Sequence, residues 1–349
     1  MPKSIVIMAG GTGGHVFPAL AVAHYFLEQG WNVSWVGTDK GMENRVVAEN
    51  NIDIDRLSVN GLRGKGGLAL LKMPSMLLKT CLQARAIFKQ RKPNVVLGMG
   101  GFVAGPGGVM AKLMGIPLVI HEQNRIPGTT NRLLSRFATK VLQAFPNSFT
   151  AEKKAVFTGN PLRKEFIAQQ SVEAAHKKNL QLLVMGGSLG AQRLNELVPE
   201  AIAQLQEVEV HHQTGEAMQQ QVADAYQQSG IEAETTAFIS DVVAAYRRAD
   251  IVICRAGAMT VSEVAAMGLP SILIPYPYAI DDHQTANAQY LVEAGAAVMI
   301  NQKELTAIEL VTQIKYCIEH KEMMAKAAKQ CAKLNATEGV AAQCRLVVR

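Results

Sequence analysis

Residues 4–15 read SIVIMAGGTGGH, an apolar run followed at once by a glycine-rich turn. The apolar run predicts a buried strand, and the pattern after the turn predicts a helix. Pro18 suits the first turn of such a helix, and glycine lets the backbone approach a ligand closely. The unpaired amides at a helix start favour phosphate. The stretch predicts an anion site; the alternative is a tight connection that holds no ligand.

The same turn departs from the dinucleotide fingerprint. Read from Gly11 and Gly13, that pattern requires a small residue at position 16, where this chain has Val16. A nicotinamide cofactor is therefore disfavoured.

Length and composition set the class of protein. The 349 residues, 48% of them apolar, suit two domains. No apolar run reaches the roughly 18–20 residues that span a bilayer, and the short first run reads as a strand rather than a signal peptide. The five cysteines are scattered, which favours reduced cytosolic thiols, and no metal-type cluster of cysteine and histidine occurs.

The charge is distributed unevenly between the two halves. Residues 1–160 hold 19 basic and 8 acidic residues, whereas residues 161–349 hold 16 and 21. No acidic residue lies between Asp55 and Glu122, and leucines alternate with lysines and arginines over residues 63–92. This mix favours docking on an anionic membrane surface. The alternatives are an ordinary amphipathic helix with a solvated basic face, or nucleic-acid binding, which the scarcity of aromatic residues disfavours.

Short apolar runs alternate with helical patterns along the chain, which is typical of doubly wound α/β domains with parallel sheets. Leu180–Met185 and the following Gly186–Ala191 repeat the opening feature near mid-chain, so we expect two similar domains joined near Gly159–Lys164. Ligands then bind at the carboxyl ends of the strands, in the crevice between domains. The predicted strands after the first are 33–36, 95–97, 118–120, 140–143, 156–157, 181–185, 208–212, 237–239, 251–254, 271–274 and 297–300.

Further polar and glycine-rich segments follow predicted strands. The segment Gly98–Gly108 pairs with the opening turn as a second cradle for a diphosphate, and residues 121–124, His-Glu-Gln-Asn, suit sugar hydroxyls. Arg163 could reach a phosphate from the presumed hinge. For the last two, a hydrogen-bonded turn and a hinge salt bridge are the alternatives.

The second half carries its most specific pattern at Cys254–Pro270, where a strand, a turn and a helix starting near Met259 are predicted. Glu263 is placed in the first helical turn, where it caps the helix or accepts hydrogen bonds from a ribose. The polar cluster at residues 281–287 suits sugar recognition. Asp53-Ile54-Asp55 has the spacing of a metal-dependent sugar transferase, but we interpret it as a solvated edge before a strand.

Together these motifs, from Met8 to about Gly339, resemble the bacterial transferases that add N-acetylglucosamine to lipid I to form lipid II. The resemblance implies the GT-B architecture, in which two Rossmann-like doubly wound parallel-sheet domains face each other across a cleft. The acceptor and membrane-associating domain would span residues 1–163, with a C-terminal helix at about 337–349 packing back on it, and the donor domain residues 164–336. No obligatory cofactor and no metal are implied.

The resemblance also implies roles for individual residues. Thr12, Gly13 and Gly14 would border the sugar and the acceptor diphosphate, with Gly100 and Gly101 beside the latter. The remaining residues at the UDP-N-acetylglucosamine site would be Asn124, Arg163, Ser188, Ile239, Ala258, Met259, Thr260, Val261, Ser262, Glu263 and Gln284. Glu263 would meet the ribose, Ile239 the uracil through its backbone, and Gln284 the sugar hydroxyls.

The chemistry of this family is a single inverting displacement at the sugar. The acceptor 4-hydroxyl needs a general base, for which His15 is the candidate. Expected partners are UDP-N-acetylglucosamine, lipid I and other cell-wall synthesis proteins, but not nucleic acid. The protein is expected to bind peripherally to an anionic membrane surface, at the cytoplasmic face of the bacterial cell membrane. The alternatives are a UDP-N-acetylglucosamine 2-epimerase and a non-catalytic nucleotide-binding protein at the membrane surface.

Overall fold

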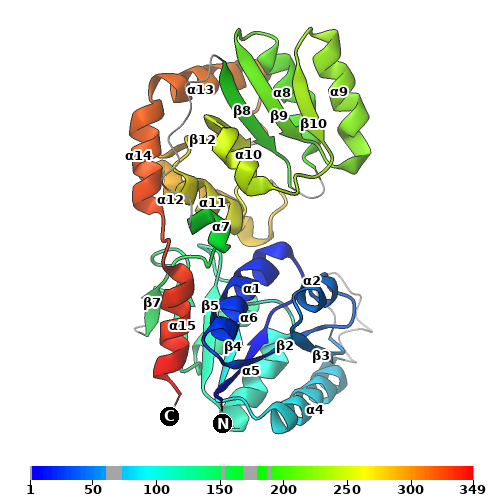
Figure 1. Cartoon of the computed structure of the whole chain (residues 1–349), viewed down its shortest axis with the longest axis vertical. Helices are drawn as coiled ribbons and strands as arrows, with labels where there is room; N and C mark the ends of the chain where they lie inside the picture. The colour runs from blue at the N-terminus through cyan, green and yellow to red at the C-terminus, as the bar shows by residue number, and fades with distance from the viewer. Residues whose placement is uncertain (1, 60–72, 151–153, 168–178, 188–189, 349) are drawn as a thin grey trace. The chain divides into compact units, whose positions relative to one another are not determined.

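The computed structural model describes residues 2–59, 73–150, 154–167, 179–187 and 190–348. It divides into an N-terminal unit, Met1–Arg163 with Leu334–Arg349, and a C-terminal unit, Lys164–Lys333 (Figure 1). Within the described residues, no helix is long and apolar enough to cross a bilayer.

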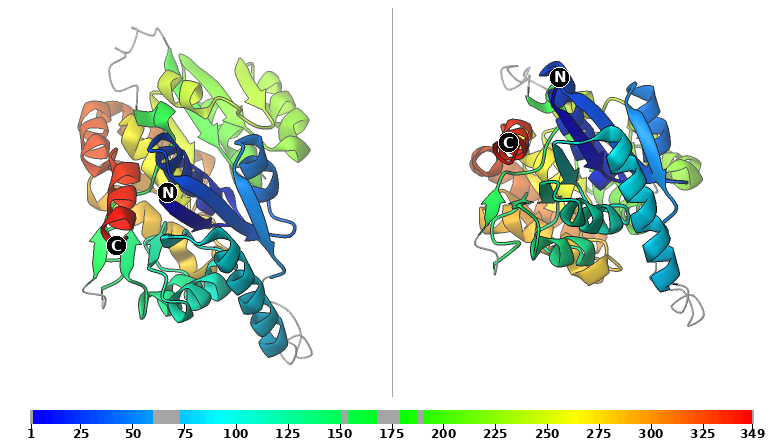
Figure 2. Two further views of the ribbon diagram at one scale, coloured as in Figure 1. Left: turned by 60° about the horizontal axis from the view of Figure 1, so that its bottom comes forward. Right: turned by 90° about the horizontal axis from the view of Figure 1, so that it is seen from below.

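The N-terminal unit contains one parallel sheet in the strand order β3-β2-β1-β4-β5-β6-β7. The long helix α4 lies beside this sheet (Figure 2), and α15 packs against α1. The elements are β1 (Ser4–Met8), α1 (Gly13–Glu28), β2 (Asn32–Thr38), α2 (Glu43–Glu49), β3 (Asp53–Leu57), α4 (Met73–Arg91), β4 (Val95–Gly98), α5 (Ala104–Leu113), β5 (Leu118–Glu122), α6 (Thr129–Ser135), β6 (Lys140–Gln143), β7 (Ala155–Phe157) and α15 (Ala336–Leu346).

Alternation along β1 explains how the two faces of this sheet are buried. Ile5 and Ile7 join a core with residues of α1 and α15, whereas Val6 and Met8 join a core with residues of α4 and α5. Successive side chains of a strand point to opposite faces, so an apolar run without polar interruptions indicates a strand covered on both sides. That reading of residues 4–8 is confirmed.

The C-terminal unit repeats the arrangement with the order β10-β9-β8-β11-β12-β13, again all parallel. The predicted doubly wound α/β class is therefore confirmed for both units. The elements are α7 (Lys164–Ile167), β8 (Leu180–Met185), α8 (Gln192–Ile202), β9 (Val208–Gln213), η1 (Glu216–Met218), α9 (Gln219–Gln228), β10 (Ala233–Thr236), α10 (Val242–Arg248), β11 (Ile251–Cys254), α11 (Ala258–Met267), β12 (Ser271–Leu273), η2 (Ile280–Asp282), α12 (His283–Glu293), β13 (Ala297–Met299), α13 (Ala307–Glu319) and α14 (Lys321–Cys331).

Three local predictions are wrong. The strand expected at 237–239 is the preceding segment, β10, whose threonines pair with β9, whereas Phe238 after it is exposed. Helix α1 begins at Gly13, inside the glycine turn, so Pro18 lies in its second turn. Asp53 and Asp55 lie in β3 rather than before it, and Arg91 binds both carboxylates, at 2.7 and 2.8 Å.

Candidate active site

The first glycine turn, residues 10–14, joins β1 to α1 at the carboxyl end of a central strand. Thr12 is the extended N-cap residue of α1, and the His15 amide donates to the Thr12 carbonyl at 3.0 Å. His15 therefore lies in the first turn of α1 and is half-buried. The first amides of a helix have no intrahelical acceptor, so the anion site that the sequence predicts at this turn stays a prediction.

The glycine loop at residues 98–101 contacts this turn. A methyl group added at Gly100 would lie 2.7 Å from the Cδ2 atom of His15, and one added at Gly101 would collide with the Gly10 carbonyl. The Met99 amide donates to the Met8 carbonyl at 2.8 Å. The two glycine segments thus lie in contact, and this contact packs the imidazole against backbone. Their predicted role as a joint cradle for a diphosphate stays a prediction.

The loop that follows β5 is organised by a buried carboxylate. Glu122 accepts hydrogen bonds from the backbone amide of Asn124 at 3.0 Å, the Gly128 amide at 3.1 Å and the Asn131 side chain at 2.9 Å. The Asn124 side chain also donates to Glu122, at 3.3 Å. These hydrogen bonds form a turn that holds Asn124 in place, while the sugar-binding role predicted for this segment stays a prediction.

His121 is a fixed structural group. It is fully buried, and burial lowers its pKa to about 4, partly offset by its hydrogen bond to the Gly159 carbonyl at 2.9 Å. A neutral imidazole that donates to a carbonyl anchors β5 to the Gly159 turn.

Arg163 ends the N-terminal unit. Its guanidinium lies 6.0 Å from the centre of the Phe17 ring, within cation–π range. Phe17 belongs to α1, so this contact ties Arg163 to the helix that begins at the first glycine turn.

The second glycine turn, residues 186–190, joins β8 to α8 in the C-terminal unit. Ser188 and Leu189 lie outside the described residues. Gly190 lies so close to the Thr214 carbonyl that an added methyl group would collide with it. Asn195 of α8 donates to the same carbonyl at 2.8 Å. The predicted helix start at Gln192 is confirmed.

Helix α11 begins at Ala258, one residue before Met259, near which the sequence predicts its start. Its first intrahelical bond runs from the Val261 amide to the Gly257 carbonyl at 2.9 Å, so the amides of Met259 and Thr260 precede the helical ladder. The Ser262 hydroxyl donates to the Ala258 carbonyl at 2.9 Å. These residues, Ala258 to Ser262, form another helix start able to hold an anion.

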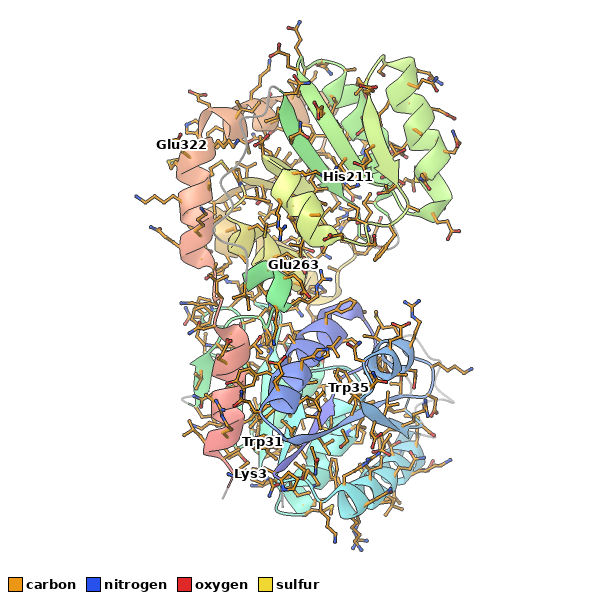
Figure 3. All side chains as sticks on the ribbon, viewed as in Figure 1. Lys3, Trp31, Trp35, His211, Glu263 and Glu322 are labelled. Atoms are coloured by element: carbon orange, nitrogen blue, oxygen red, sulfur yellow. The ribbon has the colours of Figure 1, made fainter. Side chains whose placement is uncertain are left out.

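The placement of Glu263 in the first turn is wrong, because α11 begins at Ala258 and puts it in the second turn. Capping is therefore not its role. Glu263 projects from α11 in the C-terminal unit (Figure 3). Its side chain accepts from the Tyr246 hydroxyl at 3.3 Å. Burial, followed by the nearby Glu263 charge, raises the pKa of the Cys254 thiol to about 12, so that thiol stays protonated.

The polar cluster at 281–287 divides between inward and outward roles. Gln284 accepts from the Tyr276 amide at 2.9 Å, which fixes its side chain near the end of β12. Asn287 is buried and donates to the Ala256 carbonyl at 3.2 Å, so it supports the segment before α11 rather than a ligand. Ile239 is buried in the loop after β10.

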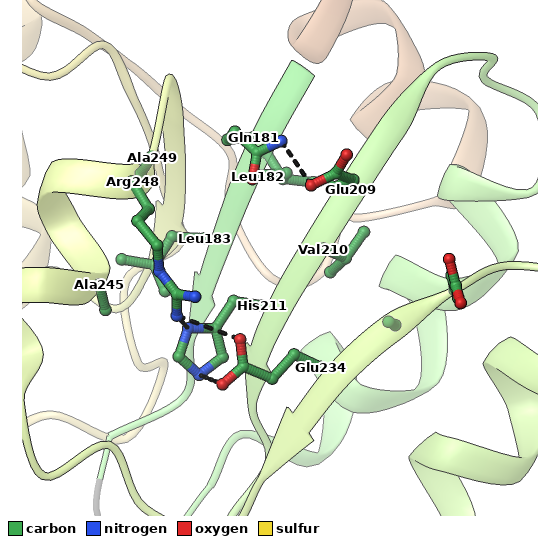
Figure 4. Close-up of a pocket in the computed structure, with 12 residues that line it drawn as sticks. Gln181, Leu182, Leu183, Glu209, Val210, His211, Glu234, Ala245, Arg248 and Ala249 are labelled. Carbon is green, nitrogen blue, oxygen red and sulfur yellow. Dashed lines mark hydrogen bonds and ion pairs between the residues drawn. The ribbon is translucent and has the colours of Figure 1, made fainter. Parts of the chain in front are cut away.

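A separate cavity of about 350 Å³ opens over β8, β9 and β10 (Figure 4). Its polar side chains bind one another: Arg248 pairs with Glu234 at 3.1 Å, and Gln181 donates to Glu209 at 2.8 Å. None of the predicted site residues lines it. Among the described residues, no group of three histidine, cysteine or acidic side chains is placed to hold a metal ion.

Comparison with known proteins places the chain in a family. The model of the glycosyltransferase family 28 N-terminal domain matches residues 5–143, and that of the C-terminal domain matches residues 181–343. This chain belongs to glycosyltransferase family 28. Its two Rossmann-like domains have the GT-B fold, as the sequence predicts.

Full-length relatives of this family 28 chain carry one name. A protein of Methylococcus capsulatus is 55% identical and is named UDP-N-acetylglucosamine–N-acetylmuramyl-(pentapeptide) pyrophosphoryl-undecaprenol N-acetylglucosamine transferase; the match covers 99% of this chain and 98% of that one. The crystal structure of Acinetobacter baumannii MurG superposes with a TM-score of 0.85 at 41% identity, covering 99% of this chain and 100% of that one.

A UDP-N-acetylglucosamine 2-epimerase from Neisseria meningitidis superposes with a TM-score of 0.67 at 14% identity, covering 99% of both chains. At that identity the likeness concerns the fold alone. The epimerase and the transferase alternatives of the sequence analysis therefore share an architecture, and sequence identity favours the transferase.

Proposed function

We propose that this family 28 chain is a hexosyltransferase that moves N-acetylglucosamine from UDP-N-acetylglucosamine to the 4-hydroxyl of the muramyl sugar of lipid I, forming lipid II. Full-length relatives that bear this name support it. The observation that carries the proposal is local: an imidazole, His15, packs against Gly100 where two glycine segments meet at a helix start.

The donor is bound mainly by the C-terminal unit. The amides at the start of α11, from Ala258 to Ser262, and Ser188 of the second glycine turn hold the diphosphate with Arg163. Glu263 accepts hydrogen bonds from the ribose, and the backbone of Ile239 meets the uracil. Asn124 and Gln284 bind the sugar hydroxyls; both side chains are held by their own loops.

The acceptor diphosphate is bound by the N-terminal unit. The turn residues Thr12, Gly13 and Gly14 and the loop residues Gly100 and Gly101 surround it. Backbone amides at the start of α1 supply donors, and the positive end of the helix dipole favours the anion. No side chain at these glycines blocks a close approach of phosphate oxygens.

Transfer is a single displacement. The acceptor 4-oxygen forms a bond to the anomeric carbon while the bond from that carbon to the β-phosphate oxygen breaks, and UDP leaves with the electron pair. His15 takes the hydroxyl proton. The charge that develops on UDP is stabilised by Arg163 and the helix-start amides. The displacement converts the α-linked donor into a β-1,4-linked product.

The acceptor carries a lipid, and α4 supplies a surface for its membrane. Leu78 and Leu82 of this helix are 64% and 53% exposed, and Lys79, Arg85 and Lys89 on the same helix are exposed as well. Apolar side chains among basic residues bind an anionic lipid surface. The protein therefore binds peripherally at the cytoplasmic face of the membrane. Residues 60–72 of the basic stretch lie outside the described residues.

The test is UDP release from UDP-N-acetylglucosamine, measured with and without a lipid-diphosphate acceptor bearing the muramyl sugar. We expect release only with the acceptor, together with formation of the disaccharide lipid. Acceptor-independent release or epimerisation at C2 would support the epimerase alternative. UDP-sugar binding without turnover in either condition would support a non-catalytic nucleotide-binding protein.

A further inference from the structure

One fully buried carboxylate lies behind the first glycine turn. Glu43 begins α2, and none of its surface is exposed to solvent. Burying an ionised carboxylate costs several kcal/mol unless its oxygens are hydrogen-bonded. A carboxylate retained in such a place therefore needs a structural or functional reason.

Both carboxylate oxygens of Glu43 accept hydrogen bonds. Oε1 accepts from the Thr38 amide at 2.8 Å and from the Thr38 hydroxyl at 2.7 Å. Oε2 accepts from the Gly11 amide at 3.2 Å. Thr38 ends β2, so Glu43 connects the carboxyl end of one strand to the turn that follows its neighbour, β1.

Three glycines make the space that this carboxylate occupies. A methyl group added at Gly10 would lie 2.7 Å from Oε1, and one added at Gly37 would lie 2.7 Å from Cγ. A methyl group at Gly41 would collide with the carboxylate as well. The backbone closes around Glu43 on three sides, so this side chain has one position.

The consequence lies on the opposite side of the turn. Gly10 is held between Glu43 and the glycine loop, because Gly101 abuts the Gly10 carbonyl. Gly100, the neighbour of Gly101, contacts the His15 ring. The Gly11 amide points to Glu43 and cannot donate to a ligand, whereas the amides of Gly13 and Gly14 start the helix.

We propose that Glu43 is a positioning residue for the acceptor site. It fixes the Gly10–Gly11 backbone so that the amides of Gly13 and Gly14 face the acceptor diphosphate and His15 stays against Gly100. This inference rests on the proposed function of that turn. Its ligand is the diphosphate of the lipid-linked acceptor; the uridine nucleotide does not depend on it.

The test substitutes Glu43→Gln, which keeps the size of the side chain. The amide has one acceptor oxygen, so if that oxygen keeps Thr38, the Gly11 N–H faces another donor. We expect kcat/KM for the lipid-diphosphate acceptor to fall about tenfold through a higher acceptor KM, the size expected for one hydrogen bond to a charged group. The UDP dissociation constant is expected to stay within about twofold, since that ligand is held elsewhere.

The matched control is Glu49→Gln. Glu49 lies on the same helix, and its side chain is 62% exposed and lies 3.9 Å from Arg45. We expect wild-type kinetics from it. A merely structural role for Glu43 would instead lower the melting temperature and the active fraction, reducing kcat with the acceptor KM unchanged, and that result would overturn the proposal.

A second readout is independent of turnover. Hydrogen–deuterium exchange of a peptide covering residues 9–16 is expected to be faster in Glu43→Gln than in wild type; unchanged exchange would refute the proposal. Wild-type protein without acceptor-dependent UDP release would count against the proposed function, while the exchange result still decides the role of Glu43. If Glu43→Gln does not fold, Thr38→Val provides the test, because it removes one donor to Oε1. We expect this variant to have an acceptor KM about threefold higher than wild type. An unchanged acceptor KM would refute the proposal.

Discussion

The two glycine turns occupy the same place in their sheets but are held in different ways. The first turn follows β1, which lies between β2 and β4. The second follows β8, which lies between β9 and β11. The first turn is held by a buried carboxylate, Glu43, that takes the Gly11 amide. In the second, the described contacts are to backbone, with Gly190 and Asn195 both at the Thr214 carbonyl.

If the proposed function holds, this difference lets one repeated motif bind two ligands. Three hydrogen bonds satisfy the Glu43 carboxylate behind the first turn, which reduces its repulsion of the anion that we propose in front of that turn. An imidazole, that of His15, follows the first turn, whereas Ala191 and Gln192 follow the second turn. We assign the first turn to the acceptor and to proton removal, and the second to the nucleotide.

The largest expected effect concerns His15. Replacing the proposed general base in His15→Ala should lower kcat by about 100- to 10,000-fold. UDP binding should change little, because we propose that the C-terminal unit holds the nucleotide. Steady-state kinetics with the lipid acceptor and UDP titration measure the two effects; turnover close to wild type would remove His15 as the base.

The next effect concerns the nucleotide side of the comparison. Glu263→Gln should raise the UDP dissociation constant about tenfold, the loss of one charged hydrogen bond to the ribose, with the acceptor KM unchanged. Tyr246→Phe serves as the control, since it removes the hydroxyl that donates to Glu263 at 3.3 Å and leaves the carboxylate. Equal affinity in Glu263→Gln and wild type would show that the ribose is bound by other groups.

A smaller effect is expected on membrane binding, which we assign to the N-terminal unit and not to the C-terminal unit. Leu82→Glu should weaken binding to vesicles containing anionic phospholipid about fivefold, since it removes roughly 1 kcal/mol of apolar burial. Ile308→Glu changes a side chain that is 73% exposed on α13 of the C-terminal unit, and should leave binding unchanged. Co-sedimentation measures both; equal loss in the two variants would argue against α4 as the docking surface.

A further expected effect is on stability at acidic pH. Burial lowers the pKa of His121 to about 4 and that of His212, in the C-terminal unit, to about 3. A histidine in the unfolded chain is protonated below about pH 6.5. Between that pH and the lower native pKa, the unfolded state binds a proton that the native state does not. The stability from each neutral imidazole is complete above that pH and falls by about 1.4 kcal/mol per pH unit as the pH drops from 6.5 toward 4.

Urea unfolding at pH 7.5, 6 and 5 measures this loss. His121→Gln should flatten the pH dependence of the N-terminal unit, and His212→Gln that of the C-terminal unit. Stability that rises as the pH falls through this window would contradict the neutral, buried state of both imidazoles.

Much of the fold follows from patterns within single segments. Continuous apolar runs such as residues 4–8 and 251–254 predict strands buried on both faces, because sheet burial dictates that composition. The error at 237–239 arose because Phe238 and Ile239 are as apolar as a strand. Pairing with β9 selects Ala233–Thr236 instead, and no local signal reports that pairing.

The candidate site was predicted where glycines and polar residues stand together in the sequence. The residues that hold those groups were missed. Glu43 and Asn131 each lie in ordinary helical sequence, and their partners, Gly11 and Glu122, are 32 and 9 positions away. The only local sign of Glu43 that we find is a pair of glycines, Gly37 and Gly41, around the end of β2. Such a pair indicates that another group packs closely against the backbone, but it does not indicate which residue that is.

The division of roles between the two turns is tested most directly by measuring acceptor KM and UDP dissociation constant on two glycine variants. Gly101→Ala and Gly190→Ala each add a methyl group against a backbone carbonyl at positive φ, 80° and 73°. Gly115→Ala and Gly230→Ala, at φ of 70° and 68° with open space around them, control for strain alone. We predict that Gly101→Ala raises only the acceptor KM and Gly190→Ala only the UDP dissociation constant. Both constants changing together in either variant, beyond the change in its control, would contradict separate roles for the two turns.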